Sequence, residues 1–186
     1  VGIASSGYKT KLMIIRVTNS AGDSTTAGLF NGIKWATDNG ARVINSSVGV
    51  IADGLSQAAI NEYNNAVAYA WDRGVVVVAA AGNCFGNTNG RPECSIRSAN
   101  GTTISGYAAN PKLYPAASPN VISVAASTVD NTLAAYSNRN DTTAGNWISV
   151  AAPGGDGACT DSTKTCILST VPGASLRYFW QSGTSM

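Results

Sequence analysis

The chain has 186 residues, and because 44% of them are hydrophobic it can bury one substantial core, so we expect one domain. Twelve basic and ten acidic residues leave a net charge of +2 without a basic cluster, which argues against nucleic acid and anionic membranes as partners. No apolar run approaches the roughly 20 residues needed to cross a bilayer.

The first elements follow a strand and helix pattern. Leu12–Val17 is short, apolar and rich in β-branched residues, which predicts a strand covered on both faces. Candidate N-cap residues follow at Ser24–Thr26, and apolar residues then recur at helical spacing from Leu29 to Ala36. We expect that helix to stop at Asn39–Gly40.

The alternation continues through the middle of the chain. Val43–Val48 predicts a second strand that turns polar towards its end, and Leu55–Arg73 predicts a longer helix capped by Gly74. Val75–Ala80 predicts a third strand, apolar enough to be central in a sheet. The pattern indicates an α/β fold in which a parallel sheet carries helices on both faces.

Small and polar residues follow the predicted strands, and ligands of such sheets bind beyond the carboxyl ends of the strands. These residues are Ser47–Gly49 and Ala81–Asn83.

The second half is predicted to be rich in loops. Cys84–Asn110 is polar and dotted with glycine, which is typical of a long surface loop. Val121–Ala126 and Trp147–Ala151 predict further short strands, and Arg177–Trp180 leads into the closing segment.

Four cysteines enclose two short polar segments. Local disulfides Cys84–Cys94 and Cys159–Cys166 are favoured over zinc ligation, because zinc sites draw on closer cysteine spacing and often on histidine, and no histidine occurs in this sequence. Disulfides indicate an oxidising, extracellular compartment, so we expect a secreted protein.

The chain closes on Gly183-Thr184-Ser185-Met186, where an apolar strand gives way to an expected helix. Taken alone, Ser185 is more often a helix N-cap than a nucleophile. A helix N-terminus would also stabilise negative charge near Ser185.

Four segments and this closing motif, in order along the chain, resemble the subtilisin-like serine proteases, the subtilase family. The segments are Val43–Gly49, Gly74–Asn83, Tyr114–Ala116 with Val121–Ala125, and Ser149–Gly154. The resemblance covers essentially all of the chain. It implies a three-layer subtilisin-like fold, of which residues 1–186 form a partial catalytic domain without the N-terminal Asp and His part and the C-terminal helical part.

The resemblance also implies site roles. Ser185 becomes the nucleophile that forms an acyl-enzyme, and Asn83 becomes a side-chain donor to the oxyanion. Tyr114-Pro115 matches a position where the family often has a cis peptide. The implied function is that of a serine endopeptidase, although the isolated chain is expected to be inactive because the triad Asp and His are absent.

The implied substrate-binding edges are two short segments at the strand ends, where an extended peptide can add as a strand. The segments are Ser47, Val48 and Gly49, with Ala80, Ala81 and Gly82. Their small residues border the pocket for the residue before the scissile bond, so a large apolar or aromatic side chain is expected there. Ser24–Thr26 depart from the family's common pattern near the outer pocket.

Cofactors and partners follow from the same resemblance. Some relatives bind a cation through backbone carbonyls near Ala116, Ser118 and Val121, so calcium is an option for the full-length protein, while no cofactor is evident in this chain. We expect protein or peptide substrates, no nucleic acid, no membrane and a monomer, and the precursor could carry a pro-peptide.

Other interpretations remain open. The chain is an internal fragment of an active protease, one piece of a nicked protein, or a non-catalytic subtilase-like binding fragment, and the retained Ser185 and Asn83 favour the first. An α/β-hydrolase-type esterase also places Gly-x-Ser at a strand–helix turn. A nucleotide-binding module ranks lower, because no Gly-x-Gly-x-x-Gly follows a strand.

Overall fold

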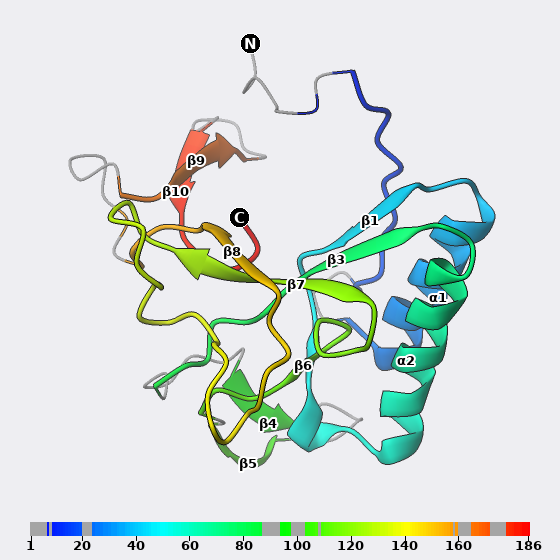
Figure 1. Cartoon of the computed structure of the whole chain (residues 1–186), viewed down its shortest axis with the longest axis horizontal. Helices are drawn as coiled ribbons and strands as arrows, with labels where there is room; N and C mark the ends of the chain where they lie inside the picture. The colour runs from blue at the N-terminus through cyan, green and yellow to red at the C-terminus, as the bar shows by residue number, and fades with distance from the viewer. Residues whose placement is uncertain are drawn as a thin grey trace.

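The structure is a computed structural model (Figure 1). It describes residues 7, 9–19, 24–86, 94–97, 103–107, 109–157, 159, 165–171 and 178–186.

A parallel sheet of four strands forms the centre of the fold (Figure 1). Its order is β1-β3-β7-β8, and all three strand pairs are parallel. The strands are β1 (Val43–Ser46), β3 (Val76–Ala80), β7 (Val121–Ser127) and β8 (Val150–Pro153). The predicted α/β class with a mainly parallel sheet is therefore confirmed.

Two α-helices begin at side-chain caps. α1 (Thr26–Asp38) starts after Thr25, whose hydroxyl accepts from Gly28 N at 2.9 Å. α2 (Gln57–Trp71) starts after Ser56, whose hydroxyl accepts from Ala59 N at 3.2 Å. Neither helix has the length and apolar character of a membrane span, nor does any other helix in the described ranges.

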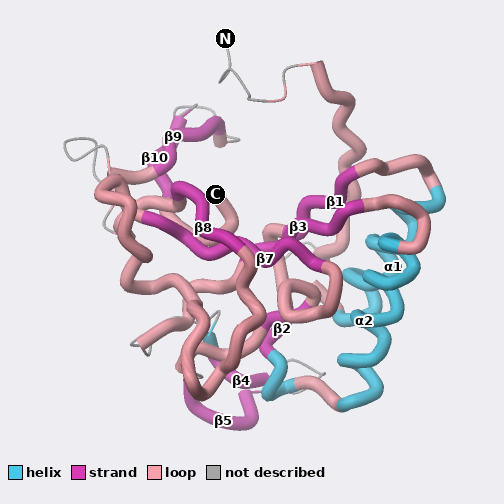
Figure 2. The backbone as a smooth tube through the Cα atoms, viewed as in Figure 1, coloured by secondary structure: helices cyan, strands magenta, loops and turns pink. Residues whose placement is uncertain are grey.

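Both helices pack against the same face of the sheet, as Figure 2 shows. Val77 is aligned with Ile44 on one side and Val121 on the other, and all three face the helices. The core beneath the helices consists of Ile33, Ala66, Val67, Ala70, Val75 and Val77. In the described part of the chain no helix covers the opposite face, although the sequence pattern led us to expect helices on both.

Apolar side chains on that opposite face are open to solvent. Val43, Ile122 and Val150 are 61%, 41% and 52% exposed. The alternation of period two along each strand places them away from the helices.

The strand expected at Leu12–Val17 is absent, so that prediction is wrong. Leu12 and Ile14 are 82% and 85% exposed, whereas Ile15 and Val17 lie over Gly32 of α1. A strand needs a neighbour that takes its backbone hydrogen bonds, and no described strand pairs with this segment. Apolar character alone gave the wrong prediction here.

Three small antiparallel pairs accompany the main sheet. β2 (Val50–Ile51) pairs with β6 (Leu113–Tyr114), and a 3-10 turn, η1 (Ala52–Gly54), follows β2. β4 (Ser95–Arg97) pairs with β5 (Thr103–Tyr107), within the segment expected to be only a surface loop. β9 (Ile167–Thr170) pairs with β10 (Tyr178–Gln181), and β9 was not predicted.

The strand expected at Trp147–Ala151 starts later, at Val150. Asn140 accounts for this difference, because its Oδ1 accepts from the backbone N–H groups of Trp147 and Ile148, each at 2.9 Å. These two residues are therefore held by a side chain and not by a neighbouring strand.

Tyr63 of α2 is fully buried, 6.1 Å from the Phe30 ring and 5.9 Å from the Tyr114 ring. Burial raises the pKa of Tyr63 from 10.0 to about 12, and the Thr26 side chain opposes only part of this rise. Above pH 10 the unfolded chain loses this proton before the folded chain does. The contribution of the protonated Tyr63 hydroxyl to the free energy of unfolding is thus complete below pH 10 and is lost as the pH rises towards 12.

Phenylalanine has no proton to lose. We therefore expect Tyr63→Phe to lack the part of the decrease in unfolding free energy at alkaline pH that Tyr63 causes, which amounts to about 3 kcal/mol for two pKa units. The measurement is the free energy of unfolding between pH 9 and pH 12, with Tyr178→Phe at an exposed tyrosine as the control. Parallel pH curves for the wild type and Tyr63→Phe would contradict this expectation.

Candidate active site

The site forms where the carboxyl ends of β1 and β3 lie side by side. Ser47–Gly49 follows β1 and Ala81–Asn83 follows β3, and the register Ser46 to Ala79 brings both segments to the same edge of the sheet. The turn Gly183–Met186 lies against this edge, because hydrogen bonds join it to both segments. The structure thus brings together residues that are far apart in the sequence.

Ser185 is half-buried and is held by a reciprocal pair of hydrogen bonds. Its Oγ donates to the carbonyl oxygen of Ser47 at 2.9 Å, and the Ser47 hydroxyl donates to the carbonyl oxygen of Ser185 at 3.1 Å. A backbone carbonyl fixes the direction of the hydroxyl but is no base. Activation of Ser185 therefore requires a proton acceptor in addition to these contacts.

Asn83 is oriented by Thr184, the residue before the serine. Its Oδ1 accepts from the backbone N–H of Thr184 at 2.9 Å and from the Thr184 hydroxyl at 3.0 Å. The Thr184 hydroxyl in turn accepts from Gly82 N at 3.0 Å. Because two donors fix the amide oxygen, the Asn83 Nδ2 is directed away from Thr184, and no acceptor in the described ranges takes its hydrogens.

Close backbone packing supports the turn that carries the serine. Gly183 N donates to the carbonyl oxygen of Gly154 at 2.9 Å. A Cβ at Gly154 would lie 2.6 Å from the Gly183 oxygen and 2.5 Å from the Ala126 Cβ, so only glycine fits. The Ser149–Gly154 motif of the sequence thus ends in a residue that lets the turn approach the sheet.

Asn138 supports the other side of the site and was not singled out from the sequence. It is fully buried, its Oδ1 accepts from Cys84 N at 2.7 Å, and its Nδ2 donates to the Pro111 oxygen at 2.7 Å. Its own N–H donates to the Gly82 oxygen at 2.9 Å. The Tyr136–Asn138 segment carries no local signature for this role, which depends entirely on tertiary contacts.

The two disulfides pair as the sequence predicted: Cys84 with Cys94, and Cys159 with Cys166. Cys84 directly follows Asn83, and both Cys84 and Cys94 are buried. The first bridge therefore anchors the chain immediately after the candidate oxyanion donor.

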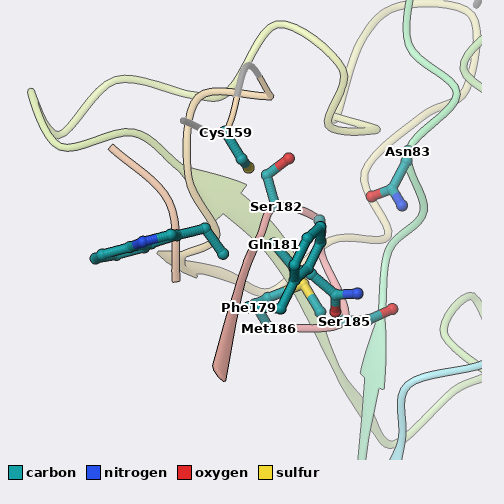
Figure 3. A pocket seen from close by; sticks show the side chains of 9 residues that line it. Asn83, Cys159, Phe179, Gln181, Ser182, Ser185 and Met186 are labelled. Carbon is teal, nitrogen blue, oxygen red and sulfur yellow. The ribbon is translucent and has the colours of Figure 1, made fainter. Parts of the chain in front are cut away.

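A cavity of about 430 Å³ opens beside Ser185 (Figure 3). Asn83 and Ser185 line it together with Phe179 and Trp180 of β10 and Ser182. None of the six predicted substrate-binding residues lines this cavity. Of the segments that follow β1 and β3, only Asn83 borders this cavity, so the cavity is separate from the predicted substrate-binding residues.

Those six residues do not all have free groups for a substrate. Val48 is 38% exposed, but Ala81 is fully buried and its N–H donates to the Val124 oxygen at 2.9 Å. The Gly82 N–H is likewise taken, by Thr184. A peptide that pairs along this edge would have to use other backbone groups.

The Tyr114-Pro115 peptide is cis, as the resemblance implied. In the described ranges no group of three or more His, Cys, Asp or Glu side chains is placed to hold a metal ion. That finding concerns side chains, whereas the expected calcium ligands are the backbone carbonyls of Ala116, Ser118 and Val121. Calcium binding by the full-length protein therefore stays a prediction.

The structure thus places a serine hydroxyl and an amide with a fixed oxygen side by side at the carboxyl edge of a parallel sheet, which is the edge where ligands of α/β folds bind. A family model for the subtilase family matches residues 2–186. The chain therefore belongs to the subtilase family, and this membership favours the subtilase interpretation over the esterase alternative.

Individual relatives agree with this membership. The chain is 35% identical over 185 residues to "Thermophilic serine proteinase" of Bacillus sp. (strain AK1), covering 100% of this chain and 35% of the relative. It is 36% identical over 187 residues to "Thermitase" of Thermoactinomyces vulgaris, covering 100% of this chain and 50% of the relative. The chain thus spans between a third and half of the length of these relatives.

Among solved structures, the chain is similar to the epidermin leader peptide processing serine protease of Staphylococcus aureus. The TM-score is 0.65 at 27% identity, and the match covers 91% of this chain and 43% of the other. The mixed α/β fold with its parallel sheet is therefore that of the subtilisin-like proteases.

Proposed function

We propose that this chain carries the nucleophile and an oxyanion donor of a serine endopeptidase, Ser185 and Asn83. The observation that supports this most strongly is the contact of Asn83 with Thr184, the residue before the serine. Thr184 donates two hydrogen bonds to the Asn83 Oδ1, and the Asn83 Nδ2 is therefore directed away from Thr184. A second support is that a relative matched over the whole chain is named "Thermophilic serine proteinase".

In the proposed reaction the Ser185 Oγ attacks the carbonyl carbon of a peptide bond. The hydroxyl proton passes to a base, and the carbonyl oxygen becomes an anion that accepts a hydrogen bond from the Asn83 Nδ2. The C–N bond then breaks, the proton moves from the base to the leaving amine, and an acyl-enzyme remains on Ser185. Water releases the acyl group by the reverse sequence.

The base must come from outside these residues, since the sequence has no histidine. In the structure the Ser185 hydroxyl donates to the Ser47 oxygen, so it has to turn from this acceptor to the base before it can attack. The proposal therefore treats the Ser47 contact as the resting position of the hydroxyl, which the hydroxyl leaves before the attack.

We place the extended substrate along the ends of β1 and β3, with the acyl side over Ser47–Gly49 and Ala80–Gly82. The cavity bordered by Asn83, Phe179 and Trp180 then lies on the leaving-group side.

We also propose that the protein is secreted. The two disulfides support this, and so does the 32% identity over 195 residues to an "Extracellular protease" of Xanthomonas campestris, covering 100% of this chain and 27% of that protein.

The test compares the isolated 186-residue chain with the intact protein that contains it. We expect the isolated chain to hydrolyse no internally quenched peptide, because a serine without its base loses most of the rate, whereas the intact protein cleaves peptides and unfolded proteins. Peptide hydrolysis by the isolated chain that Ser185→Ala abolishes would contradict the expected inactivity. An intact, folded protein without peptidase activity would overturn the proposed function.

A further inference from the structure

One side chain occupies the space between the two predicted substrate-binding edges. Leu113 lies in β6, which pairs with β2 directly behind the strand ends. A Cβ placed at Gly82 would lie 2.9 Å from the Leu113 Cδ1 and 3.0 Å from its Cδ2. A Cβ placed at Gly49 would lie 3.3 Å from the same Cδ2. The tip of Leu113 therefore contacts both edges at once.

Packing holds Leu113 in this position. Behind it lies a buried cluster of Ile51, Cys84 and Cys94, and Leu113 packs against this cluster. The Cys84–Cys94 disulfide crosslinks the cluster, and both cysteines are at most 2% exposed. The crosslinked apolar cluster therefore supports Leu113 from one side and opposes its movement in that direction when a substrate arrives.

The consequence concerns the size of the substrate side chain that enters between the edges. The resemblance to the family led us to expect a large apolar or aromatic residue there, because small residues such as Gly49 and Gly82 border the pocket. Leu113 fills the volume that those small residues leave open. The open cavity beside Ser185 lies elsewhere, and neither Gly49, Gly82 nor Leu113 lines it.

We infer that Leu113 is a specificity-determining residue that restricts the residue before the scissile bond to small side chains, such as those of alanine and serine. This inference rests on the proposed function, because it assumes that the acyl side of a peptide lies between Gly49 and Gly82. Discrimination by a filled pocket is steric: even one methylene in a hydrophobic pocket changes kcat/KM by about 10 to 200-fold.

The experiment uses the intact protein and two internally quenched peptides that differ only in alanine or phenylalanine before the scissile bond. We expect the wild type to prefer the alanine peptide in kcat/KM by about tenfold or more. Leu113→Gly is expected to raise kcat/KM for the phenylalanine peptide by about tenfold or more, and Leu113→Ala to do so by less. Leu133→Ala, at a leucine that is 44% exposed, is the matched control and leaves the ratio unchanged.

Each outcome decides the inference. Wild-type preference for phenylalanine, or an unchanged ratio in folded Leu113→Gly and Leu113→Ala variants, overturns it while the proposed function stands. If thermal unfolding shows that Leu113→Gly does not fold, the inference is decided by the preference of the wild type and by the kcat/KM ratio of the Leu113→Ala variant for the two peptides. If the intact protein cleaves neither peptide nor any other substrate, the proposed function fails and the inference fails with it.

Discussion

Replacing Ser185 with alanine is expected to lower kcat of the intact protein by about six orders of magnitude, which is the loss that follows removal of the catalytic serine in subtilisin. The reason is that the substitution removes the atom that forms the acyl-enzyme. Asn83 keeps its contacts with the backbone N–H and hydroxyl of Thr184, so the oxyanion donor stays in place. A small residual rate over the uncatalysed reaction is therefore expected to remain.

The measurement is single-turnover and steady-state cleavage of one peptide by the wild type and by Ser185→Ala. Ser169→Ala is the control, because Ser169 is an exposed serine of β9 that takes no part in the candidate site. A Ser185→Ala variant that keeps more than about a hundredth of the wild-type kcat would be incompatible with a serine nucleophile at this position.

Replacing Asn83 with alanine is expected to lower kcat by about 10²- to 10³-fold with little change in KM, the range seen in subtilisin when one oxyanion donor is lost. The amide contributes only when negative charge develops on the carbonyl oxygen, so the loss falls on the transition state and not on substrate binding. Asn83→Ala also removes the acceptor of two Thr184 hydrogen bonds.

A second variant separates these two effects. Asn83→Asp keeps an oxygen acceptor for Thr184 but lacks the amide donor, so it is expected to lose at least as much kcat as Asn83→Ala. Asn61→Ala, at an exposed position of α2, is the control. A change confined to KM, or full activity in Asn83→Asp, would refute the role of the amide.

The sequence predicted those elements whose pattern is local. Apolar residues at helical spacing located α1 and α2, with capping residues predicted before α1 and Gly74 predicted after α2, and apolar runs rich in β-branched residues located β1, β3 and β7. The segment Leu12–Val17 has the same apolar character but forms no strand, because strand formation depends on a neighbour that periodicity does not reveal. The pairing of β4 with β5 and of β9 with β10 was missed for the same reason.

The candidate site shows a similar division. Ser185 and Asn83 were found from motifs that lie directly after strands, and the structure places both at the same edge of the sheet. Thr184 belongs to the closing motif but has no role that its local pattern predicts, yet it orients the amide of Asn83. Leu113 reaches the space between Gly49 and Gly82 from a distant segment, so no local pattern could reveal that the expected large pocket is filled.

The central claim, that Ser185 is an activated nucleophile, is tested most directly by covalent labelling of the intact protein with a fluorophosphonate, followed by peptide mapping. We expect one adduct for each protein molecule, located on Ser185 and absent from Ser185→Ala. Folded protein that takes up no label, or a label that persists in Ser185→Ala, would contradict the claim.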